Sequence, residues 1–356
     1  MANIRITARV TLLVVLANPG ATLLAQPLRT VAVPSKVSCE KCDVVLRDEV
    51  TLGTGSALLG ILSGAVAHDR AGRFFASTFD MNSVAVYDSL GKQVAKFGRD
   101  GAGPGEFRSV VDIKIGAADS LWIGDLGRRV SVFSSSLVFA RSFTYSGDFS
   151  RAVLLPTGGF LAESKRGTLA EYSRDGKEDS ARPVSAALEH ARDPRCRNCD
   201  VRSLSSSRRP GKFWSWVRNR YEIEELDLGA EVQRRYVRQV PWFEPWTAEA
   251  ELIPLPRVSG VREDSVGRLW VVIHVPDARW EPSTGPTSLT SAADYDRLYD
   301  SIIEVIDLQT GWLITSKRLP AMLALMQDGL AFTLRDDMDG RIVIDVWSLR
   351  LLGLTK

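Results

Sequence analysis

The sequence is short of charge of one sign, of cysteine and of long apolar runs. Its 45 Lys and Arg residues nearly balance 43 Asp and Glu, a net charge of +2, which argues against a nucleic-acid-binding protein because such proteins have a large basic excess. Four cysteines in 356 residues exclude a cysteine-dense secreted scaffold, so a large apolar core has to stabilise the chain. With 45% hydrophobic residues, the chain is too apolar for a disordered protein.

The apolar run nearest the N-terminus, Val10–Ala17, is far shorter than the roughly 20 residues that span a bilayer, and no other stretch of the sequence predicts a transmembrane segment. Arg5 and Arg9 precede this run, and small residues up to Ala25 follow it. This pattern predicts a secretory signal peptide over residues 1–25, and therefore a secreted or periplasmic protein. The alternative is an ordinary buried N-terminal strand.

The cysteines form two Cys-x-x-Cys pairs. Cys39 and Cys42 lie in an N-terminal extension, residues 26–42, and Cys196 and Cys199 lie far along the chain. Two such pairs also resemble a zinc ribbon, but zinc knuckles are usually separated by only about 15–20 residues. In an oxidising compartment we expect disulfides. Four cysteines allow three pairings, and the spacing does not decide among them.

Short alternating strands separated by Gly, Asp and Ser turns fill residues 64–145. The order of strands in 64–97 recurs in 111–143, and Tyr87 and Phe133 occupy equivalent places 46 residues apart. Such alternation is typical of antiparallel meanders. A period of about 40–50 residues with four strands per unit indicates a β-propeller.

Four further units can be traced to the C-terminus, which gives six blades. The sequence therefore predicts an all-β fold, a six-bladed β-propeller of four-stranded antiparallel blades over residues 43–356. The strand-like segment Asp43–Leu52 precedes the first unit, so we expect this N-terminal strand to join the last blade and close the ring. Closure removes the unpaired edges of an open sheet.

Three motifs resemble the NHL repeat of six-bladed propellers: Phe97–Phe107, Leu121–Asp125 and Arg129–Phe133. The resemblance implies that the Gly-rich stretch in the first motif joins two blades. This sequence departs from the family pattern at Gly127 and Arg128, where an Asn commonly precedes the Arg-Val pair. The chain also resembles exported bacterial six-bladed propellers.

Two insertions, about 181–210 and 276–300, interrupt the repeat. Propeller loops commonly build a binding surface, because function concentrates on loops held by a rigid scaffold. Rigid aromatic side chains suit a protein, peptide or carbohydrate ligand. Packing between blades explains the same residues equally well. The binding-face candidates are Trp242, Trp246, Trp280 and Tyr295.

Arginine outnumbers lysine by 35 to 10, with local runs at Arg208–Arg209, Arg218–Arg220 and Arg234–Arg235. These runs are candidates for an anion-binding patch, because the guanidinium fork matches carboxylate and phosphate groups. The alternative is the codon bias of a GC-rich genome.

The sequence has only three histidines, which leaves few candidates for a metal-dependent active site. Propeller lyases and lactonases gather His and acidic side chains around a central metal, and His68, His274 and Glu263 are the candidates for such a calcium or zinc site. The simpler interpretation is structural, because Asp69 and Asp264 fall where blade turns use aspartate.

The sequence thus favours an exported, non-catalytic binding or interaction module, expected to be a monomer with no cofactor and an unidentified ligand. The alternative is a metal-dependent hydrolase or lyase of the lactonase or amidating-lyase propeller kind.

Overall fold

The computed structural model describes residues 29–54, 65–78, 81–145, 147–164, 168–182, 202–247, 253–282, 291–326, 329–338 and 341–354. The predicted signal peptide, Cys196 and Cys199 lie outside these residues, and so do 183–201 and 283–290 of the two predicted insertions. None of the helices among the described residues is long and apolar enough to cross a membrane.

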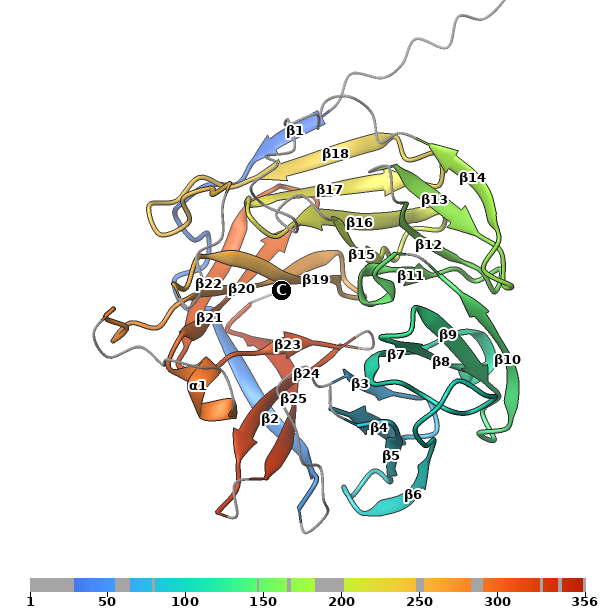
Figure 1. Cartoon of the computed structure of the whole chain (residues 1–356). Helices are drawn as coiled ribbons and strands as arrows, with labels where there is room; N and C mark the ends of the chain where they lie inside the picture. Colours follow the sequence, from blue (N-terminus) through green and yellow to red (C-terminus); the bar gives the residue numbers. More distant parts are fainter. Residues whose placement is uncertain are drawn as a thin grey trace, which may run out of the picture.

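Six antiparallel sheets are arranged as blades around a central channel, which confirms the predicted fold (Figure 1). In each of the first three blades the strands follow one another from the channel outward. They are β3 (Ala65–His68), β4 (Phe74–Ser77), β5 (Val84–Tyr87) and β6 (Gln93–Phe97) in blade 1; β7 (Val110–Ile115), β8 (Leu121–Asp125), β9 (Arg129–Phe133) and β10 (Phe139–Thr144) in blade 2; and β11 (Val153–Leu154), β12 (Phe160–Glu163), β13 (Leu169–Tyr172) and β14 (Glu178–Arg182) in blade 3.

Blades 4 and 5 follow the same order, and blade 6 takes its outer strand from the N-terminus. Their strands are β15 (Arg202–Ser206), β16 (Lys212–Val217), β17 (Glu222–Asp227) and β18 (Val232–Val237) in blade 4; β19 (Arg257–Glu263), β20 (Arg268–Pro276), β21 (Tyr299–Asp307) and β22 (Leu313–Leu319) in blade 5; and β23 (Ala324–Leu325), β24 (Leu330–Asp336), β25 (Ile342–Leu352) and β2 (Asp43–Leu52) in blade 6. Three short helical segments complete the described chain: η1 (Ala117–Asp119), η2 (Phe149–Arg151) and α1 (Ala292–Asp296).

The N-terminal strand closes the ring as predicted. β2 pairs antiparallel with β25 from Asp43↔Leu352 to Leu52↔Ile344. The sequence did not predict β1 (Arg29–Ala32), which pairs parallel with β18 and makes blade 4 five-stranded. The extension is therefore part of the sheet system.

The first insertion is shorter than predicted, because β15 at Arg202–Ser206 is the inner strand of blade 4. This strand contains a single apolar residue, Leu204, so alternation did not reveal it. Its register is supported instead by buried charge: the Arg202 guanidinium donates to Glu224 at 2.9 Å. In the second insertion, α1 begins at a capping box in which Ser291 and Asp294 bond each other's backbone.

The apolar core is divided among the interfaces between blades. Six buried clusters each join two neighbouring blades, so that every interface in the ring has its own. Trp122 of blade 2, for example, packs edge-on against Phe160 of blade 3 at 6.4 Å. Sheets of this kind pack face to face, and each blade depends on both neighbours for burial of its two faces.

The first disulfide pairs Cys39 with Cys42, which confirms a disulfide and settles the pairing for these two cysteines.

Candidate functional site

The two ends of the channel differ in how the chain connects its strands. In blade 5, β19 ends at Glu263 and a short turn leads to β20, so that Arg257 at the start of β19 lies opposite His274 near the end of β20. We call the end that holds these short turns the turn end. The opposite end is the loop end, because the long connections 238–256 and 277–298 lie there.

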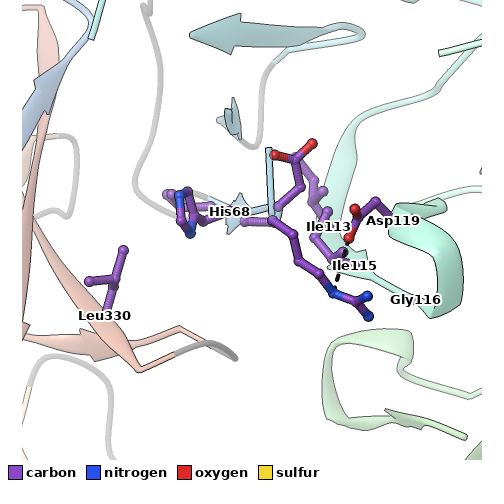
Figure 2. Close-up of a pocket in the computed structure, with 10 residues that line it drawn as sticks. His68, Ile113, Ile115, Gly116, Asp119 and Leu330 are labelled. Carbon is purple, nitrogen blue, oxygen red and sulfur yellow. Dashed lines mark ion pairs between the residues drawn. The ribbon is translucent and has the colours of Figure 1, made fainter. Parts of the chain in front are cut away.

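A pocket of about 510 Å³ lies at the turn end between blades 1, 2 and 6. Figure 2 shows His68 and the isoleucines of β7 facing the opening, with Leu330 of β24 across from them. Apolar side chains form the wall, and charged groups lie at the rim. The lining residues are Val66, Ala67, His68, Asp69, Arg70, Ile113, Ile115, Gly116, Asp119 and Leu330.

The rim of this pocket holds an ion pair on a strained turn. Arg70 Nε lies 3.5 Å from Asp119 Oδ1, and Arg70 is largely exposed (Figure 2). Asp119 and the preceding Ala118 both have positive φ, 54° and 53°. Two such residues in succession build the tight turn between β7 and β8, and this turn places the carboxylate beside the pocket.

His68 and Asp69 have structural partners at the end of β3. The His68 ring stacks on Phe74 with centroids 4.4 Å apart. Asp69 is buried, and its carboxylate accepts from the backbone N–H of Arg73 at 2.9 Å and from its Nε at 2.8 Å. Asp69 therefore holds the turn, as its place in the sequence predicts.

Glu263, at the same end of the channel in blade 5, is also occupied. Its Oε2 accepts from Ser207 Oγ at 2.7 Å, from the backbone N–H of Arg208 at 3.0 Å and from Trp214 Nε1 at 3.0 Å. All three donors belong to blade 4. This carboxylate ties two blades together, and its lone pairs are directed toward protein donors.

His274 lies at the loop end. Its Nε2 is 2.8 Å from the carbonyl oxygen of Leu323, so Nε2 carries the proton and donates. Its Nδ1 accepts from Arg257 Nε at 3.4 Å. Burial first, and then the charge of Arg257, lower the pKa of His274 to about 3. The ring is therefore neutral at physiological pH.

The candidate metal ligands are not brought together. His68 and Glu263 lie at the turn end on different blades, whereas His274 lies at the other end, separated from Glu263 by roughly 20 Å of strand. The part of the chain that the structure describes contains no group of three or more His, Cys, Asp or Glu side chains placed to hold a metal ion.

The four binding-face candidates all lie in the loop-end connections of blades 4 and 5. Trp246 is buried, and its Nε1 donates to the carbonyl oxygen of Pro256 at 2.7 Å. Trp242 is half-buried against the cluster between these blades. Trp280 and Tyr295 are also half-buried. Packing thus accounts for Trp246 and much of Trp242, and a binding role for Trp280 and Tyr295 stays a prediction.

Two of the three arginine runs have structural partners in blade 4. Arg209 and Arg234 lie 2.6 and 4.0 Å from the buried carboxylate of Glu225, and Arg235 lies 2.8 Å from Glu224. Arg218, in the third run, lies at the loop end, with its Cζ 5.7 Å from the centroid of the Trp246 ring. Composition alone did not distinguish these surroundings.

No family model matches the sequence, and no curated protein matches it. Among solved structures, the chain is similar to a member of the DUF4221 family from Bacteroides vulgatus, at 9% identity over 88% of this chain and 99% of that one, with a TM-score of 0.60. It is also similar to a protein from Bacteroides fragilis described as a putative exported protein, at 10% identity over 92% and 100% of the two chains, with a TM-score of 0.56.

Both likenesses show the propeller fold. At this identity they contain no information on chemistry. The NHL family itself is not among the matches reported above, so that part of the resemblance stays a prediction.

Proposed function

We propose that the protein is an exported, non-catalytic binding module of the six-bladed propeller class, related in its repeats to the NHL type, that takes a small ligand or a short segment of a larger one at the turn end. The observation that supports this proposal is the channel pocket of about 510 Å³. Its volume falls within the usual range for ligand sites, roughly 300–1,000 Å³. An apolar wall with a few polar groups at the rim is also the usual composition of such sites.

The state of the polar groups favours binding over catalysis. Asp69 and Glu263 accept hydrogen bonds from protein donors that fix turns and blades, and His274 is buried, neutral and at the far end. A general base needs to reach its substrate within hydrogen-bond distance, and these groups are already occupied elsewhere.

Export is supported by two features of the N-terminal region. Residues 1–25 have the pattern of a signal peptide, and the Cys39–Cys42 disulfide suits an oxidising compartment. We therefore expect a secreted or periplasmic protein, and we propose separately that it acts as a monomer.

A pocket-filling variant tests the proposal. Saturation-transfer NMR on the mature protein would use N-acetyl amino-acid amides with Leu, Phe or Trp side chains, and monosaccharides, as probes. We expect at least one probe to bind, and we expect Ile115→Trp, which fills the pocket, to abolish that binding.

The matched control is Val138→Trp, since Val138 is 63% exposed and is not among the residues that line the pocket. Equal loss in both variants, or no binding by any probe, would contradict the assignment of this pocket. A stoichiometric zinc or calcium ion in the purified protein would overturn the non-catalytic proposal and favour the hydrolase or lyase alternative.

A further inference from the structure

The loop end of the channel gathers positive charge and aromatic rings at a place that the proposed ligand pocket does not use. We define the arginine mouth as Arg218, Arg257, Trp246, Tyr295 and Tyr299. Arg218 follows β16, Arg257 begins β19 and Tyr299 begins β21, whereas Trp246 and Tyr295 lie in the two long connections at the loop end. Both arginines are half-buried.

Arg257 is held over an aromatic face. Its Cζ lies 4.3 Å from the centroid of the Tyr299 ring. Its Nε donates to His274 Nδ1 at 3.4 Å, and its Nη2 lies 4.0 Å from Met322 Sδ. Among the residues that the structure describes, no carboxylate contacts Arg257, and its partner His274 is neutral. The positive charge of Arg257 is therefore not compensated by these neighbours.

Arg218 is fixed beside Arg257 by the backbone. The N–H of Val258 donates to the carbonyl oxygen of Arg218 at 2.9 Å, which places the two chain segments side by side. The Arg218 Cζ lies 5.7 Å from the centroid of Trp246. Trp246 in turn donates to Pro256, the residue before Arg257, at 2.7 Å. The indole thus forms a rigid support under one guanidinium and next to the other.

The charges at the mouth act on one another. Burial first, and then the positive charges of Arg257 and Arg151, lower the pKa of Arg218 to about 10. The charge of Arg257 also opposes the rise that burial produces in the pKa of Tyr295. The charges of Arg218 and Arg257 therefore act on the same region, and the positive charge of Arg257 would favour an anion bound there.

We propose that the arginine mouth is a binding site for an organic carboxylate attached to a planar or apolar group, with the carboxylate between Arg257 and Arg218. The guanidinium fork matches a carboxylate through two parallel hydrogen bonds. The half-buried ring of Tyr295 offers contact area to the body of the ligand, whereas the buried rings of Tyr299 and Trp246 support the two guanidinium groups. A free peptide C-terminus and a sugar acid share this chemistry. The site is separate from the turn-end pocket and does not depend on it.

Isothermal titration calorimetry with four probes distinguishes a peptide C-terminus from a sugar acid as the source of the carboxylate. The probes are N-acetyl-phenylalanine, N-acetyl-phenylalanine amide, glucuronic acid and inorganic phosphate. We expect the free acid of one or both organic probes to bind, the amide to bind at least about 10-fold more weakly, and the affinity to fall with added salt. Binding by N-acetyl-phenylalanine alone indicates a peptide terminus, and binding by glucuronic acid alone indicates a sugar acid.

Arg257→Gln should weaken binding of the acid about 10-fold or more. The matched control is Arg279→Gln, because Arg279 lies in the long connection of blade 5 that follows β20 and is already paired with Asp277 at 3.1 Å. Arg257→Lys keeps the positive charge but removes the two-pronged guanidinium group, so it should lower the affinity for the acid by an intermediate factor. This variant provides a second readout if the Gln variant does not fold.

Equal affinity for acid and amide, equal losses in the Arg257 and Arg279 variants, or binding by phosphate alone would each overturn the proposal. Ile115→Trp at the turn end should leave acid binding unchanged. Loss of binding in that variant would contradict the independence of the two sites, whereas failure of the turn-end probes alone would leave the arginine mouth intact.

Discussion

At the scale of single residues, buried carboxylates join neighbouring strands and blades. Glu304 is fully buried in blade 5, and it accepts from Tyr221 Oη at 2.6 Å and from Arg238 Nη2 at 2.8 Å, both in or next to blade 4. Ser316 Oγ adds a third hydrogen bond at 3.0 Å. Tyr221 and Arg238 are buried together with the carboxylate, so removal of the carboxylate leaves both unsatisfied.

We expect Glu304→Ala to destabilise the fold by about 3–5 kcal/mol, because it leaves the buried Arg238 charge without its partner. Urea unfolding followed by tryptophan fluorescence measures this change. Arg99→Ala, which removes an exposed pair with Glu106, is the control and should leave the midpoint unchanged. Similar midpoints for both variants would contradict this account of Glu304.

His274 makes stability depend on acid. Its pKa is about 3 in the folded protein against 6.5 for an ordinary histidine, so below pH 6.5 the unfolded chain binds the extra proton and the folded one does not. The free energy of unfolding should therefore fall as pH drops from 6.5 toward 3, by about 2 kcal/mol at pH 5 from this residue.

His274→Gln, which keeps a donor for the Leu323 carbonyl oxygen, should remove that part of the slope. Urea unfolding at pH 7, 6 and 5 measures the difference between the two proteins. An identical pH dependence in wild type and variant would contradict the lowered pKa of the buried ring.

At the scale of elements, aspartates recur at the start of the turns between strands. Asp69, Asp88, Asp264 and Asp337 each accept from the backbone N–H four residues later. The side chain replaces a strand partner for that N–H and fixes the reversal. The turn between β7 and β8 is different, because Ala118 adopts a left-handed conformation (φ 53°) that costs a residue with a Cβ about 1 kcal/mol or more.

Ala118→Gly should therefore raise the free energy of unfolding by about 0.5–1 kcal/mol, as the relief of backbone strain exceeds the entropy that glycine adds to the unfolded chain. Thermal unfolding by calorimetry measures the gain. Ala117→Gly is the matched control, since Ala117 is not among the described residues with positive φ and should gain nothing. A gain in both variants, or in neither, would contradict the strain argument.

At the scale of the whole molecule, the N-terminal segment binds three blades together. β1 pairs with β18 of blade 4, the N–H of Ser38 donates to Leu313 of blade 5 at 2.7 Å, and β2 completes blade 6. Thr315 Oγ1 also donates to the carbonyl oxygen of Cys42 at 3.0 Å. This path (Figure 1) crosses the point where the ring closes, and the Cys39–Cys42 disulfide constrains it there.

Replacement of both Cys39 and Cys42 by alanine should lower the free energy of unfolding by about 2 kcal/mol, the value expected for so short a cross-linked loop. Chemical denaturation of the variant against wild type measures it. Lys41→Ala, in the same loop with an exposed side chain, should change nothing. Equal stability of the double variant and wild type would show that the N-terminal segment does not need the Cys39–Cys42 disulfide to hold the ring together.

The sequence predicted the six-bladed ring and its closure by Asp43–Leu52, because repeated period-two strands and turn residues are local patterns. It did not predict β15 or β1. The pattern of β15 is polar, and its burial depends on Glu224 from another strand. β1 is stabilised by the exposed edge of β18, a partner about 200 residues away.

The repeat period, the alternation of the strands and the turn residues by themselves determined an all-β ring with aspartate-held turns. Only the tertiary structure decided the functional geometry, because it depends on which ends of distant strands meet. It separated His68, His274 and Glu263, which the sequence allowed to converge, and it placed Arg218 beside Arg257 while pairing Arg234 and Arg235 with blade 4 carboxylates. The near-zero net charge of +2 conceals a local cluster of positive charge, since charge balance is a sum over the chain and recognition depends on distance.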